Sequence, residues 1–286
     1  MKKIVYLILV SLLISTSCKK DNKSQEKQVS NQVPEKQPNI ILIYADDLGY
    51  GDVSAYGATE IKTPNMDKLA NGGVKFTNGY ATSATCTPSR YALLTGIYPW
   101  RNKEAKILPG TAPLLIDTAQ VTIPKMLKTK GYHTGIVGKW HLGLGNGNVD
   151  WNTHISPGPN EVGFDYSYIM AATQDRVPTV YIKNGYVDNL DLNDPIQVNY
   201  DKNFEGEPTG TDNPELLKMV GDPQHSNSIN NGVPRIGYMK GGASAKWIDE
   251  DMADHFLSEA QNYIKRQSDK PFFLYYALQQ PHVPRT

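Results

Sequence analysis

Continuous apolar runs alternate with amphipathic segments along much of the chain, which predicts strands and helices in turn. The run at 39–45 is rich in branched residues and has few polar interruptions, which indicates a strand buried on both faces. Segments 133–139 and 271–277 have the same character. They follow segments 121–130 and 247–266, which we expect to be helices. A repeated helix-then-strand order predicts an α/β fold with a mostly parallel central sheet flanked by helices.

Further elements are expected outside this repeat. Segment 63–70 predicts a helix that stops at Gly72-Gly73, and 74–81 predicts a short strand. Segment 180–187 predicts a hairpin, because its central Asn-Gly pair suits a type I′ turn. Most of 142–245 is rich in Gly, Asn and Pro. We expect it to form a long elaboration over the strand ends, where substrate selectivity usually resides.

The N-terminus has the pattern of a secretory signal. A basic start precedes an apolar run at 4–14 that is too short to span a bilayer, and small residues follow before Cys18. We therefore expect residues 1–17 to be a signal peptide. The segment resembles a bacterial lipoprotein signal, which implies a lipid anchor on Cys18 and a lipid-anchored flexible tether at 18–38. An ordinary signal peptide with an incidental Cys is the alternative.

Charge is balanced over the whole chain, with 29 basic and 29 acidic residues. The first 38 residues contain seven of the Lys residues and only three acidic residues, so the rest of the chain is mildly acidic. A nucleic-acid-binding protein would present a basic face, so we expect no nucleic-acid partner. A mildly acidic body suits a metal-binding cleft better.

Cys86 is a candidate for chemistry because it has no obvious disulfide partner. The chain contains two cysteines, and if Cys18 carries lipid, an exported protein would keep one unpaired thiol. Pro88 suits the first position of a helix that continues through Leu94, which places Cys86 at or just before the helix N-terminus. Free N–H groups there attract anions. Cys86 is therefore a candidate nucleophile at an anion site.

Ionisable residues follow each of the three predicted strands. They are Asp46 and Asp47 after the first strand, Lys139 and His141 at the end of the second, and His282 after the third. Because ligands bind at the carboxyl ends of parallel strands, we expect these side chains to converge in one crevice. Carboxylates suit Ca²⁺ or Mg²⁺, and the cationic side chains suit an anionic substrate beside that metal. Each residue alone is common in turns and caps, so the shared position carries the hypothesis.

Four ordered motifs resemble the type I sulfatases, arylsulfatase A-like members of the alkaline-phosphatase-like superfamily. The motifs are Asp46-Asp47, the Cys86-Thr87-Pro88-Ser89-Arg90 segment, the segment 131–141, and Gln280-Pro281-His282-Val283-Pro284. The resemblance covers 39–286 and implies a sulfatase catalytic domain. Sulfatases continue to an Asp-Asn pair, a further Lys and a small C-terminal antiparallel-sheet domain. We therefore expect an N-terminal portion truncated at its C-terminus, and we do not expect this portion alone to be active.

The resemblance also implies a modified residue and a metal site. In the family the motif Cys is converted to formylglycine, so Cys86 would be that residue, produced by a formylglycine-generating enzyme before export. Asp46, Asp47 and an oxygen of modified Cys86 would bind Ca²⁺, with Mg²⁺ as the alternative. With these ligands alone, a cation that prefers six or more oxygens would be under-coordinated.

Roles for the other site residues follow from the same motifs. Arg90 would steady the oxygen of the modified residue, and Lys139 would hold the sulfate. His141 would accept a proton, and His282 would contact the sulfate and donate a proton to the leaving oxygen. The metal would polarise both the nucleophile and the sulfuryl oxygens.

The expected function is hydrolysis of sulfate esters on sulfated carbohydrates. The segments 173–178 and 232–239 resemble arylsulfatase A-like members that include bacterial enzymes acting on sulfated polysaccharides, and Asp175, Arg176 and His225 are candidate sugar contacts. The expected location is the periplasm or cell surface of a Gram-negative bacterium. A phosphodiesterase or phosphonate monoester hydrolase of the same superfamily is one alternative. An inactive truncated lipoprotein that binds glycan is another.

Overall fold

The computed structural model describes residues 37–267 and 269–286. The predicted signal peptide at 1–17, the predicted lipid anchor Cys18, and the tether except for its last two residues lie outside the described residues. Within the described part of the chain, every helix is too short or too polar to cross a membrane.

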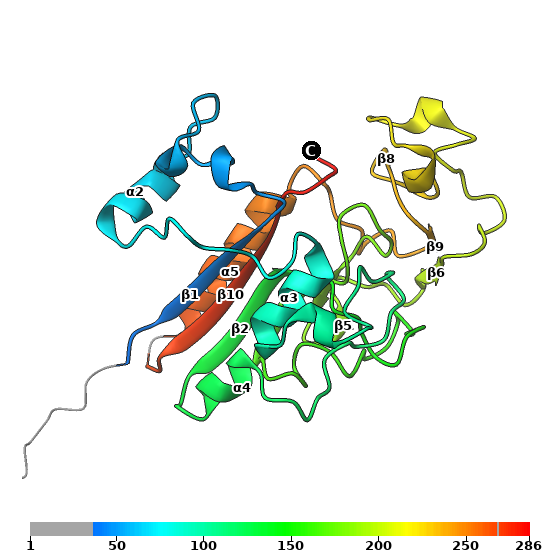
Figure 1. The fold of residues 1–286 in the computed structure, drawn as a ribbon. Coiled ribbons are helices and arrows are strands. Elements are labelled where there is room, and N and C mark those ends of the chain that lie inside the picture. Colours follow the sequence, from blue (N-terminus) through cyan, green and yellow to red (C-terminus); the bar gives the residue numbers. More distant parts are fainter. Residues whose placement is uncertain (1–36, 268) are drawn as a thin grey trace, which may run out of the picture. The chain divides into compact units, whose positions relative to one another are not determined.

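A six-stranded sheet forms the centre of the fold (Figure 1). In spatial order its strands are β1 (Ile40–Asp46), β10 (Phe272–Pro281), β2 (His133–Lys139), β3 (Tyr166–Met170), β4 (Tyr181–Lys183) and β5 (Tyr186–Val187). The first four strands run parallel, while β4 is antiparallel to β3 and β5 is antiparallel to β4. The prediction of an α/β fold with a mostly parallel sheet is confirmed.

Helices cover this sheet in two layers. On one face, α5 (Met252–Arg266) packs Phe256, Ala260 and Tyr263 against β10 and β2. On the other face lie α3 (Cys86–Thr95) and α4 (Ile123–Lys128). Ile136 and Val137 are neighbours on β2, and they belong to the apolar clusters on opposite faces. The sheet is therefore buried from both sides at its centre.

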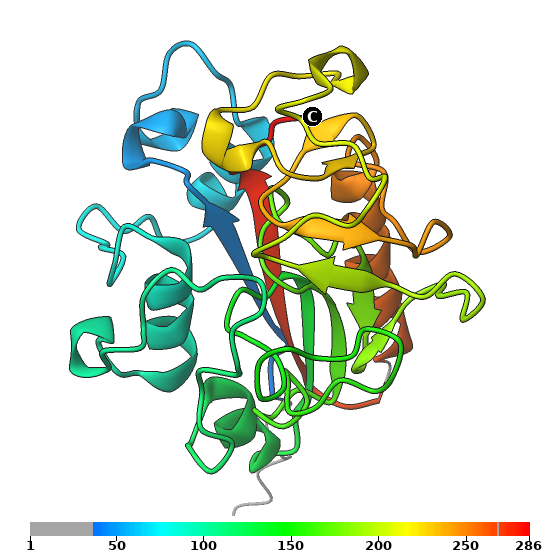
Figure 2. The ribbon, with the colours of Figure 1, turned by 90° about the vertical axis from the view of Figure 1, so that its right-hand side faces the viewer.

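Shorter elements occupy the loops. They are α2 (Pro64–Gly72), five 3₁₀ turns at Tyr50–Asp52, Ser54–Tyr56, Pro99–Arg101, Pro214–Leu216 and Pro223–His225, and the strand pairs β6 (Gln197–Asn199) with β9 (Tyr238–Lys240) and β7 (Ile229–Asn230) with β8 (Val233–Pro234). Figures 1 and 2 place β8 and the turns near it (yellow and light orange) at the end of the molecule where β1 and β10 finish. The predicted elaboration at 142–245 thus supplies loops near the carboxyl ends of these strands.

Two predicted turns and caps are confirmed in detail. Helix α2 ends at Gly72, and the β4–β5 hairpin turns at Asn184 and Gly185, whose φ angles of 47° and 82° are the left-handed values that a type I′ turn needs. Helix α3 begins at Cys86, two residues before Pro88. Cys86 therefore lies in the first turn of the helix, as the anion-site hypothesis requires.

Two element predictions were wrong, and one strand was missed. Strand β1 is not buried on both faces: Ile41 and Ile43 are 48% and 52% exposed, because β1 is the end strand of the described sheet and these side chains alternate to its uncovered face. Segment 74–81 forms no strand and is exposed. Strand β3 was missed within the Gly- and Asn-rich stretch, since its sequence Tyr-Ser-Tyr-Ile-Met lacks a long aliphatic run even though every residue is buried.

Gly138 permits the close pairing of β2 with β10 just before Lys139. Its φ is 115°, and a Cβ there would overlap the carbonyl oxygen of its partner Ala277. We expect Gly138→Ala to lower the free energy of unfolding by about 3 kcal/mol, from backbone strain together with overpacking. Gly131→Ala is a matched control, because Gly131 has a φ of 81° with open space around it. It should cost about 1 kcal/mol. Urea unfolding of both variants measures this difference, and equal losses would contradict it.

Candidate active site

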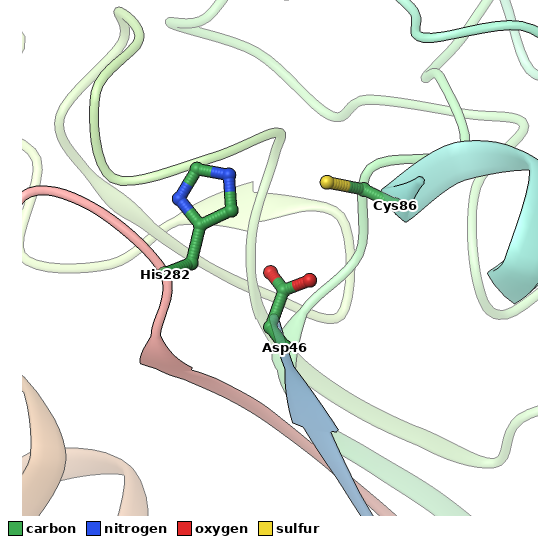
Figure 3. Close-up of side chains that lie close together, drawn as sticks. All are labelled: Asp46, Cys86 and His282. Carbon is green, nitrogen blue, oxygen red and sulfur yellow. The ribbon is translucent and has the colours of Figure 1, made fainter. Parts of the chain in front are cut away.

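The carboxyl ends of three parallel strands bring ionisable side chains to one edge of the sheet. β10 lies between β1 and β2, so Asp46, Lys139 and His282 come from adjacent strand ends. Helix α3 presents Cys86 at the same edge. Figure 3 shows the side chains of Asp46, Cys86 and His282 facing one another, and their potential ligand atoms all lie within 4.8 Å. The structure therefore brings together four residues that the sequence analysis selected.

Two cations surround the Asp46 carboxylate. The Lys139 ammonium is fully buried, donates a hydrogen bond to Asp46 Oδ2 and lies 3.3 Å from Cys86 Sγ. Arg90 Nη2 lies 3.4 Å from the same Asp46 oxygen. Burial and the charge of Arg90 lower the pKa of Lys139, although Asp46 opposes them. This arrangement concentrates positive charge beside residue 86, which suits an anionic group.

Arg90 also ties the strand ends to each other. Its Nη1 donates to the Lys139 carbonyl at 3.0 Å and to the Tyr275 hydroxyl at 3.2 Å, and its Nη2 donates to the Leu278 carbonyl at 3.4 Å. Among the described residues, these are the hydrogen bonds of the Arg90 side chain, and none goes to the Cys86 thiol. The sequence motif carried no sign of this structural role, which depends on strands far apart in the chain.

The environment of Cys86 favours a negative charge on its side chain. Burial raises the pKa of the Cys86 thiol, but His282 and Lys139 lower it more, so the pKa lies below its ordinary value. Burial lowers the pKa of His282, but Cys86, the Val283 backbone and Asp46 together raise it more, and the pKa lies above its ordinary value. Together with the N-terminus of α3, these groups can stabilise an anionic oxygen as well as a thiolate.

His141 lies outside this cluster and has a free acceptor. Its Nε2 lies 2.9 Å from the Leu108 carbonyl, which only accepts hydrogen bonds, so Nε2 carries the proton. Its buried Nδ1 has no partner among the described residues. Burial, followed by the charge of Lys139, holds the pKa of His141 well below its ordinary value, so the ring is neutral. A neutral imidazole with a free Nδ1 can accept a proton.

Asp47 takes a different position from Asp46. Its backbone is left-handed with a φ of 65°, its side chain is 49% exposed, and its carboxylate lies 3.9 Å from His282 Nε2. A cavity of about 170 Å³ is nevertheless lined by Asp46, Asp47 and Cys86. Two carboxylates and an oxygen on residue 86 would be hard donors, which suit a divalent cation such as Ca²⁺. The sulfur of unmodified Cys86 does not suit such a cation, so the fit depends on that oxygen.

A second cavity, of about 350 Å³, lies beside the segment that follows His282. It is lined by Asp175, His225 and Asp222, together with Val283 and other residues. His225 Nε2 lies 3.2 Å from Asp175, and His225 Nδ1 lies 2.6 Å from Asp222. Arg176 Nη1 pairs with Asp175 at 3.3 Å. The three candidate sugar contacts therefore lie together, and Asp222 is an additional polar residue that the sequence analysis did not select.

Comparisons with known proteins agree with this geometry. The family model described as Sulfatase matches residues 38–286. The N-acetylgalactosamine-6-O-sulfatase of Bacteroides thetaiotaomicron is 52% identical over 279 residues, which cover 97% of this chain and 54% of that protein. Arylsulfatase A of Homo sapiens is 48% identical over 111 residues, which cover 38% of this chain and 22% of that protein.

Solved structures show the same similarity. One, described under the metabolism of multiple glycosaminoglycans by Bacteroides thetaiotaomicron, superposes with a TM-score of 0.85 at 55% identity and covers 87% of this chain and 52% of that chain. The chain thus spans about half the length of these relatives. Since the family model matches most of the chain and the motif residues meet at one edge of the sheet, the chain belongs to the sulfatase family.

Proposed function

We propose that the protein containing this chain hydrolyses sulfate esters on carbohydrates, and that 6-O-sulfated N-acetylgalactosamine is its substrate. The observation that carries the proposal is the meeting of Asp46, Cys86, Lys139 and His282 at one edge of the sheet. The cavity that Val283 lines, with Asp175, Asp222 and His225 in its wall, offers room for a sugar ring. The name of the relative that is 52% identical supports the choice of sugar.

Cys86 is the proposed nucleophile precursor, converted to formylglycine by a modifying enzyme before export. A sulfated alcohol or thiol would remain as a stable ester, whereas a sulfated aldehyde hydrate can expel sulfate by returning to the aldehyde. Its position in the first turn of α3, with the Lys139 ammonium 3.3 Å from the Cys86 sulfur, supports this role. Negative charge that develops at this position is stabilised by both features.

We assign sulfate binding, proton transfer and positioning to the residues around Cys86. Lys139 holds the sulfate oxygens by charge. His282 donates a proton to the leaving sugar oxygen, and its position supports this role, because its ring nitrogen lies within 4.8 Å of the Cys86 sulfur and an Asp46 carboxylate oxygen. His141 accepts the proton that must leave residue 86 when sulfate departs, and its unprotonated Nδ1 supports this role. Arg90 holds the strand ends that position Lys139.

A divalent cation completes the proposed site. Asp46, Asp47 and an oxygen on modified residue 86 would hold Ca²⁺, with Mg²⁺ as the alternative, and the bound cation would polarise the sulfate oxygens. The cavity shared by these three residues supports this assignment.

We also propose that the protein is exported. The basic start and apolar run within 1–17 support a signal peptide, and the small residues before Cys18 support lipid attachment there. The lipid would anchor the protein at a membrane through the tether at 18–38. The proposed location of the activity is therefore the periplasm or the surface of a Gram-negative bacterium, where sulfated glycans are accessible.

The substrate proposal is tested with the full-length protein, produced with its modifying enzyme. Sulfate release from 6-O-sulfated N-acetylgalactosamine is compared with release from the 4-O-sulfated isomer and with cleavage of a phosphodiester. We expect the 6-O-sulfate to have the highest kcat/KM, by about 10²-fold or more over the diester. Faster diester cleavage would favour the phosphodiesterase alternative. Glycan binding without turnover would favour the binding lipoprotein.

A further inference from the structure

A buried ion pair lies behind the cavity beside His282. The side chains of Arg235 and Asp249 are both fully buried, and Arg235 Nη2 lies 2.5 Å from Asp249 Oδ2. Neither residue lines the cavity or touches the atoms of the proposed reaction. Because a buried pair must offset the loss of hydration of both charges, it often stabilises a fold no better than apolar residues would. The role of this ion pair is therefore to be found in the hydrogen bonds that its two side chains make with neighbouring residues.

Both charges hold Gln174. Arg235 Nη1 donates to the Gln174 carbonyl at 2.5 Å, and Gln174 Nε2 donates to Asp249 Oδ1 at 2.9 Å. Trp247 Nε1 donates to the same Asp249 oxygen at 3.2 Å. Gln174 is thus held through both its backbone carbonyl and its side-chain amide. The Asp249 carboxylate that accepts from this amide is in turn oriented by Trp247.

Gln174 directly precedes Asp175 and Arg176. The Ile236 amide, next after Arg235, donates to the Asp175 carbonyl at 2.7 Å, and the Val177 amide donates to the Ile236 carbonyl at 3.1 Å. The backbone on both sides of Arg176 is therefore bound to the segment that carries Arg235. The Asp175 carboxylate contacts His225 at the cavity wall through Oδ2, while its Oδ1 pairs with Arg176.

The side-chain amide of Gln174 also contacts the segment that carries His282. Gln174 Nε2 lies 3.2 Å from the hydroxyl oxygen of Thr286, to which it donates, and Thr286 is four residues after His282. Val283, which lines the cavity, lies between them. Gln174 therefore connects the turn that carries Asp175 to the segment that follows His282 and lines the cavity.

We propose that Arg235 and Asp249 are positioning residues for sugar recognition. They hold the turn that contains Asp175 and Arg176 against the segment after His282, and they thereby set the affinity for the sugar ring but not for the sulfate group. The inference rests on the proposed function, because it requires that the sugar occupies the cavity lined by Asp175 and His225.

The test uses three variants of the full-length protein. The double variant Arg235→Met with Asp249→Leu removes both charges at similar volume, so no unpaired charge stays buried. Gln174→Met removes the side-chain amide and leaves the ion pair in place, which provides a milder second variant. Lys128→Gln is the control, since it breaks a partly exposed pair with Asp165 at the amino ends of the strands, far along the sheet from the site.

The measurements are KM for 6-O-sulfated N-acetylgalactosamine and the inhibition constant of inorganic sulfate, which fills only the sulfate site. For the double variant we expect KM to rise about tenfold, equivalent to roughly 1.4 kcal/mol of lost affinity, with the sulfate constant changed less than about twofold. Gln174→Met should raise KM in the same direction with the sulfate constant unchanged, and Lys128→Gln should change neither.

Several outcomes separate the hypotheses. A parallel rise of KM and the sulfate constant in Gln174→Met and the double variant would show a general disturbance and overturn the proposal. Unchanged KM in folded variants would also overturn it. If thermal melting shows that the double variant does not fold, the KM and the sulfate inhibition constant of Gln174→Met alone test the proposal. Absence of sulfate release by the unsubstituted protein would instead refute the proposed function.

Discussion

Cys86→Ala should abolish sulfate release by the full-length protein, with a loss of kcat/KM of about 10⁴-fold or more. An alanine cannot be converted to an aldehyde, so the nucleophile is removed while Lys139, His282 and the start of α3 remain. Among the described residues, the hydrogen-bonding neighbours of the thiol are Lys139, which donates to it at 3.3 Å, and His282, and alanine loses only these contacts. We therefore expect the thermal unfolding midpoint to stay close to that of the unsubstituted protein, which separates loss of chemistry from loss of fold.

Cys86→Ser is the matched control for this experiment. In a host whose modifying enzyme acts on cysteine, the serine keeps its hydroxyl, and that hydroxyl can accept the sulfuryl group but cannot expel it. The variant should release at most one sugar per protein molecule and gain the mass of one SO₃. Steady turnover by either Cys86→Ala or unmodified Cys86→Ser would place the nucleophile elsewhere.

Lys139→Met should reduce kcat/KM by about 10²- to 10³-fold, because it removes the ammonium that faces residue 86. The side chain is fully buried, and methionine has a similar length, so packing is largely kept. The loss of the charge also leaves the Asp46 carboxylate with Arg90 as its remaining cation. A weaker sulfate site is therefore expected together with the slower reaction.

Sulfate inhibition distinguishes this role from a structural one. If Lys139 holds the sulfate, the inhibition constant of inorganic sulfate should rise about tenfold in Lys139→Met. Lys130→Met is a suitable control, because Lys130 is exposed just after α4. A fall in kcat with unchanged sulfate inhibition would contradict the assignment and would leave Lys139 a role in orienting Asp46.

Much of the site could be predicted because its residues adjoin the clearest apolar runs. Asp46, Lys139 and His282 each lie at or next to the end of a predicted strand, and parallel strands bring such ends to one edge. Cys86 was located by the helix signals around it, although the helix begins two residues before Pro88. These inferences needed only local patterns and one rule of sheet topology.

Other features depend on contacts between distant segments and have no local signal. Strand β3 is buried because neighbouring elements cover it, but its sequence has no long aliphatic run, so it was missed. Asp47 was grouped with Asp46, but its left-handed backbone turns it toward solvent and His282. The pair of Arg235 and Asp249 joins residues that ordinary sequence patterns do not connect, and only the fold shows that both hold Gln174.

The central claim is that residue 86 acts as a formylglycine in a sulfatase site. The most direct measurement is the mass of the peptide that contains Cys86, taken from active full-length protein purified from its native host. The account predicts the aldehyde or its hydrate at residue 86, in a fraction that increases with the specific activity of the preparation. An unmodified thiol at residue 86 throughout a preparation that releases sulfate would contradict it.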